Sequence, residues 1–139
     1  MTDPNFPEAT EEQIKEGKSL AWLSYFGILF LIPLLVYKDN PFPKYHARQG
    51  MVLFFAEIVF GIIWVILGAI VGAIAYASYS ATGFGAGAIC GTILWIVMAI
   101  LWIGIAVLAI IGIIQSAQGK FWKMPVIGAI AESWFKGMV

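Results

Sequence analysis

Three long stretches of this 139-residue chain carry almost no charged side chains. They cover residues 20–37, about 51–79 and about 88–114. A helix needs roughly 20 mostly apolar residues to cross a hydrocarbon core about 30 Å thick. The pattern therefore predicts three transmembrane helices, and the second and third are long enough to tilt, kink or protrude.

Composition excludes an ordinary soluble domain. Hydrophobic residues make up 61% of the chain and charged residues 12%, against about 45–50% and about 25% in soluble domains. The net charge of zero gives no support for a nucleic-acid partner. One cysteine and one histidine provide neither an intramolecular disulfide nor a four-ligand zinc site. We predict an all-α, polytopic integral membrane protein without a cofactor or a metal.

The sequence divides into three parts. Residues 1–19 form a polar, acidic segment, residues 20–115 the three-span domain, and residues 116–139 a basic-aromatic segment with an interfacial helix. Thr10 and Gln13 fit a capping box, so a surface helix should begin near residue 11 and run straight into the first span.

The loop before the second span and the C-terminal segment both contain proline. Pro41 and Pro43 predict an extended turn before the second span. Apolar side chains recur at helical spacing in the C-terminal segment and predict an amphipathic helix in the membrane interface, with Pro125 in its first turn.

The distribution of lysine and arginine predicts the orientation. With three spans, the 38–50 loop and the C-terminus share one side of the membrane. Six basic residues lie on that side, against two in the N-terminal segment: Lys38, Lys44, Arg48, Lys120, Lys123 and Lys136, against Lys15 and Lys18. The positive-inside rule then places the loop and the C-terminus in the cytoplasm and the N-terminus outside.

Glu57 is the one acidic or basic side chain within the predicted spans. A charge in hydrocarbon costs roughly 2–3 kcal/mol on insertion scales. Glu57 is either a proton- or ion-handling carboxylate facing a cavity, or a neutral or hydrogen-bonded group packed against another helix. His46 lies eleven residues earlier on the same helical face, about 16 Å away, and is either a relay partner or a polar residue at the helix entry.

Two small-residue motifs lie in the second and third spans. They are Gly68-Ala-Ile-Val-Gly72 and Gly87-Ala-Ile-Cys-Gly91. Glycines at this spacing let helix backbones approach closely in lipid. They predict packing of the second span on the third, or contact between copies of the chain.

No arrangement of residues suits catalysis. The turn SATGFGAG lacks the Lys-Ser/Thr pair of a phosphate-binding loop. A Ser-His-acid or Cys-His set is also implausible, because Asp39 and His46 share a short loop without a suitable nucleophile. We therefore expect the protein not to be an enzyme.

Two runs of sequence resemble a known family. The run IPLLVYKDNPFPKYHARQG, together with GIIQSAQGKFWKMPVIG, resembles a family of small bacterial and archaeal membrane proteins that carries a domain-of-unknown-function label. That family includes the magnetosome protein MamF and is distantly similar to a channel component of the chloroplast Tic translocon. The resemblance covers about residues 20–131 and implies a multi-pass protein of a prokaryotic cell membrane.

The family pattern marks one element before the second span and another after the third. They correspond here to His46, Arg48 and Gln49, and to Gln118, Lys120, Trp122, Lys123 and Pro125. Both fall on the same predicted side, so we expect residues 44–49 and 118–125 to pack together as one cytoplasmic patch.

Two functions agree with these features. The first is a membrane-organising or partner-binding role through the patch and the glycine motifs, with the lipid bilayer and other membrane proteins or further copies of the chain as partners. The alternative is a subunit of an oligomeric pore or a translocon, for which Glu57 is the main support.

Overall fold

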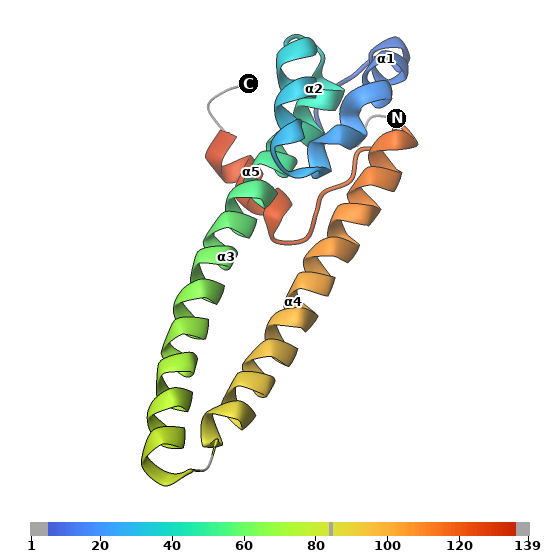
Figure 1. The fold of residues 1–139 in the computed structure, drawn as a ribbon. Helices are drawn as coiled ribbons and strands as arrows, with labels where there is room; N and C mark the ends of the chain where they lie inside the picture. Colours follow the sequence, from blue (N-terminus) through green and yellow to red (C-terminus); the bar gives the residue numbers. More distant parts are fainter. Residues whose placement is uncertain (1–5, 84, 136–139) are drawn as a thin grey trace. The chain divides into compact units, whose positions relative to one another are not determined.

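The computed structural model describes residues 6–83 and 85–135, and every regular element in these ranges is a helix (Figure 1). This confirms the all-α prediction. The chain forms two compact units, which we call the head unit (residues 1–56 and 107–139) and the hairpin unit (residues 57–106). The helices are α1 (Glu11–Ala21), α2 (Leu31–Val36), α3 (Pro41–Thr82), α4 (Ala86–Ala117) and α5 (Ile127–Phe135), with 3-10 turns at Trp22–Tyr25 and Gly27–Phe30.

Helix α1 begins where the sequence predicts. The Thr10 hydroxyl accepts from the Gln13 amide at 3.2 Å, and the Gln13 side chain accepts from the Thr10 amide at 2.9 Å. The two bonds satisfy amides at the start of the helix that would otherwise have no partner.

The predicted spanning helix over residues 20–37 is wrong. The chain there forms two four-residue 3-10 turns and then α2, which is six residues and about 9 Å long. The interruption lies at Phe26 (φ −105°, ψ 68°) and at Gly27, which has a φ of +52°. This left-handed conformation costs glycine little free energy, because glycine has no β-carbon. None of these pieces is long enough to cross a membrane.

The predicted extended turn at the two prolines is also wrong, because α3 begins at Pro41. Proline is well suited to a first helical turn, where amides lack intrahelical acceptors. Pro41 and Pro43 have no amide hydrogen, and the Phe42 amide donates to the Asn40 side chain at 3.1 Å. The start of the helix therefore leaves few backbone donors unsatisfied.

Helix α3 has a glycine where the interrupted segment crosses it in the head unit. A β-carbon on residue 50 would lie 1.7 Å from the Ser24 carbonyl oxygen, so only glycine fits against this backbone. On α4, a β-carbon at residue 112 would lie 2.6 Å from the ring of Tyr25. The segment thus packs in the head core, which includes Ala21, Tyr25, Phe30, Phe42, Ala47, Leu53 and Met124.

The N-terminal helix lies beside the loop that precedes α3. The Asn40 side chain donates to the Gln13 carbonyl at 2.7 Å. The Ser19 hydroxyl is 3.2 Å from the Tyr37 hydroxyl. The described residues between them contain no helix that is long enough to span a membrane, and the predicted location of the N-terminus outside stays a prediction.

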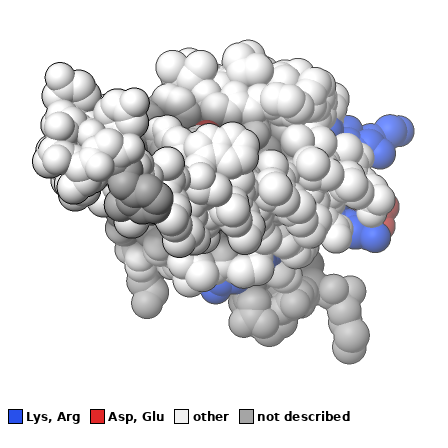
Figure 2. All heavy atoms as spheres, turned by 60° about the horizontal axis from the view of Figure 1, so that its bottom comes forward, with Lys and Arg blue, Asp and Glu red and all other residues white. Residues whose placement is uncertain are grey.

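Two helices are long and apolar enough to cross a membrane, within Pro41–Thr82 and Gly87–Ala117. Their apolar side chains are exposed through the hairpin unit, as at Val65, Tyr76 and Ile103. Figure 2 brings the lower end of Figure 1 forward and shows a face that is almost wholly uncharged. The three-span prediction is corrected to two candidate spans.

The two glycine motifs differ in their surroundings. A β-carbon on Gly87 would lie 2.2 Å from Ala75, and one on Gly91 would lie 3.7 Å from Val71, so this motif faces α3. A β-carbon on Gly68 or Gly72 would meet nothing within 4 Å. The second motif therefore faces α3 closely, and a role for either motif in helix association stays a prediction.

A short helix, α5, occupies the predicted C-terminal position. It begins at Ile127 rather than at Pro125, which precedes it. Between them, Val126 has a φ of 63°, an unusual left-handed conformation for a β-branched residue. The helix itself is confirmed within residues 127–135, and its location in a membrane interface stays a prediction.

Candidate functional site

His46 lies in the second turn of α3 and is fully buried in the head unit. Its Nε2 is 3.1 Å from the Lys120 carbonyl oxygen, and its Nδ1 is 2.8 Å from the Tyr25 hydroxyl. A carbonyl only accepts, so Nε2 carries the hydrogen and Nδ1 of the neutral ring accepts from Tyr25. Burial raises the pKa of Tyr25 above its ordinary value, so the phenol keeps the proton that it donates.

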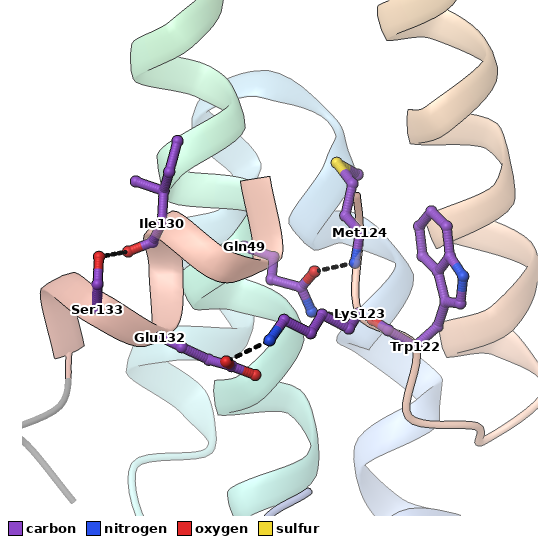
Figure 3. A network of polar contacts seen from close by, with 7 residues as sticks. All are labelled: Gln49, Trp122, Lys123, Met124, Ile130, Glu132 and Ser133. Atoms are coloured by element: carbon purple, nitrogen blue, oxygen red, sulfur yellow. Dashed lines mark hydrogen bonds and ion pairs between the residues drawn. The ribbon is translucent and has the colours of Figure 1, made fainter. Parts of the chain in front are cut away.

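Gln49 follows three residues later on the same face of α3 and is also buried. Its Nε2 donates to the Trp122 carbonyl at 3.0 Å, and its Oε1 accepts from the Met124 amide at 2.7 Å (Figure 3). The side-chain amide thus binds the extended segment 120–124 as a neighbouring strand would. We call Tyr25, His46, Gln49 and the backbone of residues 120–124 the polar junction.

Aromatic rings surround the polar junction. Phe42 lies edge-on to His46 with the ring centroids 4.9 Å apart, and Tyr45 lies edge-on to Phe121 at 5.3 Å. Phe6 stacks on Phe121 at 5.7 Å. Because these rings are apolar and packed, they lower the local dielectric and strengthen the hydrogen bonds that they enclose.

Two further contacts join α5 to the rest of the head unit. The Arg48 guanidinium lies over the Phe135 ring, 5.4 Å from its centroid. Lys123 forms an ion pair with Glu132 at the surface (Figure 3). Together with the Gln49 bonds, these contacts hold α5 against the first turns of α3.

The structure confirms that residues 44–49 pack against residues 118–125. The region where these segments pack is not wholly at the surface, because the side chains of His46 and Gln49 are buried. Lys120 and Trp122 contribute carbonyl groups to the polar junction. The side chains of four other predicted site residues are at least partly exposed and do not take part in it: Arg48, Gln118, Lys123 and Pro125. A functional role for the exposed members stays a prediction.

The remaining predicted residues lie in the hairpin unit. Glu57 is partly buried there, and no other Asp, Glu, Lys, Arg or His occurs between residues 49 and 119. Its suggested part in a pore stays a prediction. Among the described residues, no group of three His, Cys, Asp or Glu side chains could hold a metal ion.

Sequence reasoning missed Tyr25 and Met124. Tyr25 lies in a run of apolar residues that resembles a membrane span, so nothing marked it as a partner of His46. Met124 contributes a backbone amide, which carries no sequence signal. The one available clue was the spacing of His46 and Gln49 on one helical face.

A family model described as the magnetosome magnetite crystal formation protein family, MamF and MmsF, matches residues 16–131, well over half of the chain. The chain belongs to this family. The matched range includes the second half of α1, the polar junction and both long helices, α3 and α4.

Curated relatives are members of the same family. Magnetosome protein MamF of Paramagnetospirillum magneticum is 27% identical over 109 residues, which cover 78% of this chain and 77% of MamF. MamF of Magnetospirillum gryphiswaldense is 27% identical over 111 residues, or 80% and 78% of the two chains. Magnetosome protein MmsF of P. magneticum is 25% identical over 113 residues, or 81% and 83%.

No solved structure matches the chain significantly. The resemblance to MamF is confirmed, and the likeness to a translocon channel component stays a prediction.

Proposed function

We propose that the protein resides in a magnetosome-type membrane and acts in magnetite crystal formation as an organising component rather than as an enzyme. The observation that carries this proposal is the family match over residues 16–131, which extends across both the head unit and the hairpin unit. The relatives that share this range are named as magnetosome proteins.

The two units are suited to different roles. The hairpin unit exposes apolar side chains suited to lipid. The head unit carries a buried polar junction that fixes α5 and the first turns of α3 as one body. A head unit whose own elements are held together can present the same surface to a partner protein at all times, which favours an organising role.

The proposal includes a revised orientation. With two spans, the N-terminus, the loop before α3 and the C-terminus all lie on one side. All eight lysines and arginines lie in residues 1–56 and 107–139, and none lies in residues 57–106. By the positive-inside rule the head unit faces the cytoplasm, and the N-terminus with it. The apolar, exposed α2 then lies along the interface, since it is too short to span.

Cysteine labelling tests this orientation. In a Cys90→Ser background, single cysteines are placed at Glu12 in α1, at Ser133 in α5 and at Ser80 near the hairpin turn. A membrane-impermeant thiol reagent added to intact cells should label only the Ser80 position, and added to inverted membrane vesicles should label the other two. Labelling of Glu12 and Ser133 from opposite sides would overturn the two-span arrangement.

Complementation tests the function. The full chain is expressed in P. magneticum that lacks its own MamF and MmsF, and magnetite crystals are measured by electron microscopy. We expect the chain to fractionate with magnetosomes and to shift crystal size toward the wild-type value. A chain that reaches the magnetosome but leaves the crystals unchanged would contradict the proposal.

A further inference from the structure

The segment between α1 and α2 and α2 itself expose a large amount of apolar surface. Eight large hydrophobic side chains within residues 22–36 are exposed, and the most exposed of them, Leu35, is 61% exposed. Residues 19–37 contain no charged side chain. Soluble proteins rarely present so much apolar surface to water in one place, so a partner should cover this segment.

The two ends of the segment are held next to each other. The Tyr37 hydroxyl donates to the Glu16 carbonyl at 3.2 Å and lies 3.2 Å from the Ser19 hydroxyl. A β-carbon on Gly17 would lie 2.6 Å from the Pro43 side chain, so α1 packs directly on the first turn of α3. The segment therefore leaves this place and returns to it, as a loop does.

The loop lies beside the first turn of the apolar run of α3, which begins at Met51. The Ser24 carbonyl lies against Gly50. The Phe30 ring packs on the Phe54 ring, with the centroids 5.8 Å apart. Positions 50 and 54 are one turn, or about 6 Å, apart along the helix. Lipid that surrounds this turn of α3 would therefore also surround the loop.

The backbone at the interruption is suited to a surrounding without water. Phe26 has non-helical dihedral angles and an exposed side chain. Its amide nevertheless donates to the Leu23 carbonyl at 3.1 Å, and its carbonyl accepts from the Leu29 amide at 3.0 Å. Unpaired backbone groups are costly in hydrocarbon, so internal pairing at an irregular residue favours contact with lipid.

The ends of the loop carry the side chains that are typical of the headgroup level. The Trp22 Nε1 donates to the Ser19 carbonyl at 2.8 Å, and Tyr37 lies at the same serine. Tryptophan and tyrosine are enriched where hydrocarbon meets water. Lys18 and Lys38 follow on the two sides, are exposed, and can pair with lipid phosphates. This order of apolar, aromatic and basic groups is complementary to one leaflet of a bilayer.

We propose that residues 22–36 form a re-entrant loop that inserts into the acyl chains of the leaflet on the side of the head unit and returns to the same side. Its partner is lipid, and neither a second copy of the chain nor another protein covers it. The loop adds a third inserted element to the two spans of the proposed membrane arrangement, on which this inference rests. Unlike the span expected over residues 20–37, the loop does not cross the membrane.

Depth-dependent fluorescence quenching tests the loop. The full chain in a Cys90→Ser background carries one cysteine, at Ile28 or at Leu35, labelled with a fluorophore. Both side chains are exposed, so the label leaves the core intact. Vesicles of phosphatidylcholine and phosphatidylglycerol contain a lipid quencher either near the headgroup or near the end of the acyl chain. Val65 in α3 and Glu12 in α1, both exposed, are the reference positions.

We expect the shallow quencher to reduce emission from both loop positions at least about twofold more than the deep quencher, because the loop reaches about 6 Å into a leaflet about 15 Å deep. Val65 should show the reverse order. Glu12 should respond to neither lipid quencher and should be quenched by iodide in water. The two loop positions lie on different turns, so Leu35 keeps the test decisive if a label at Ile28 lowers the unfolding midpoint.

Three results at the loop would overturn the proposal while Val65 behaves as expected. Stronger quenching of Ile28 by the deep quencher would indicate a spanning helix. Quenching by iodide alone would indicate a loop in water. Protection from all three quenchers would indicate a loop covered by protein. If Val65 also escapes the deep quencher, the membrane arrangement itself fails, and the loop with it.

Discussion

Side-chain hydrogen bonds join residues at different sequence separations in the two units. In the head unit, His46 and Gln49 reach backbone atoms 73 to 75 residues later in the chain. In the hairpin unit, the hydroxyls of Ser78, Ser80 and Thr92 donate to carbonyls three or four residues earlier in their own helices. One unit is connected by polar bonds across the sequence, and the other keeps such bonds local.

The difference agrees with two kinds of surroundings. In lipid, each helix satisfies its own backbone, and helices associate through small residues such as Gly87 against Ala75. The head unit buries polar groups such as His46 and must supply their partners itself. Stability should therefore depend on close contacts and polar partners in the head much more than in the hairpin.

The largest expected effect comes from Gly50→Ala. The added β-carbon would overlap the Ser24 carbonyl, a backbone atom that cannot rotate away, so the free energy of unfolding should fall by roughly 3 kcal/mol. Gly68→Ala in the hairpin meets open space and should be neutral or stabilise its helix by up to about 1 kcal/mol. Thermal unfolding in detergent measures both, and equal losses would remove the contrast between the units.

Gln49→Leu should have the next largest effect. It leaves the Trp122 carbonyl and the Met124 amide without partners, which should cost roughly 2–3 kcal/mol. Hydrogen exchange should lose protection over residues 122–126 and keep it over the hairpin. Gln118→Leu is the exposed control, and retained protection at Met124 would show that Gln49 does not hold the segment.

Tyr25→Phe sharpens the comparison inside the head unit. Loss of the hydroxyl leaves His46 Nδ1 unpaired and should cost about 1 kcal/mol, whereas Tyr37→Phe at an exposed bond should cost less. Because burial raises the pKa of Tyr25, the unfolded chain ionises first, and this tyrosine's contribution to stability is lost as the pH rises above about 10. The wild type should therefore lose more stability than Tyr25→Phe in this range, and parallel pH profiles would contradict this.

The smallest effect is expected for Glu132→Gln. Its ion pair with Lys123 is at the surface, where such pairs contribute about 0.2–1 kcal/mol and are screened by salt. A double-mutant cycle with Lys123→Gln at two salt concentrations measures the coupling. A coupling above about 2 kcal/mol would place this contact among the determinants of the head unit.

Much of the architecture is predictable from sequence. The capping residues Thr10 and Gln13 give the start of α1, and the long apolar runs give α3 and α4. The contact between residues 44–49 and 118–125 follows from the family resemblance, since two elements on one side can pack together. These features depend on local chemistry or on a pattern shared by many chains.

The path of residues 20–37 was not predictable in this way. Hydropathy measures how apolar a segment is and not whether it continues straight. The interruption at Gly27 and the approach of Ser24 to Gly50 are features of the tertiary structure. They depend on contacts between residues that are distant in sequence. Pro41 and Pro43 misled for a related reason, since a proline that ends one helix can equally begin another.

The polar junction also sets an order of events during synthesis. His46 and Gln49 leave the ribosome more than 70 residues before the backbone groups that they bind. At roughly 5–20 residues per second, they wait about 4–15 s in the presence of the membrane. Until then Gln49 and the Nε2 of His46 lack the backbone partners that they have in the folded head unit, so the head unit can close only after residues 120–124 have been made. Synthesis of this late segment is thus a condition for the native fold.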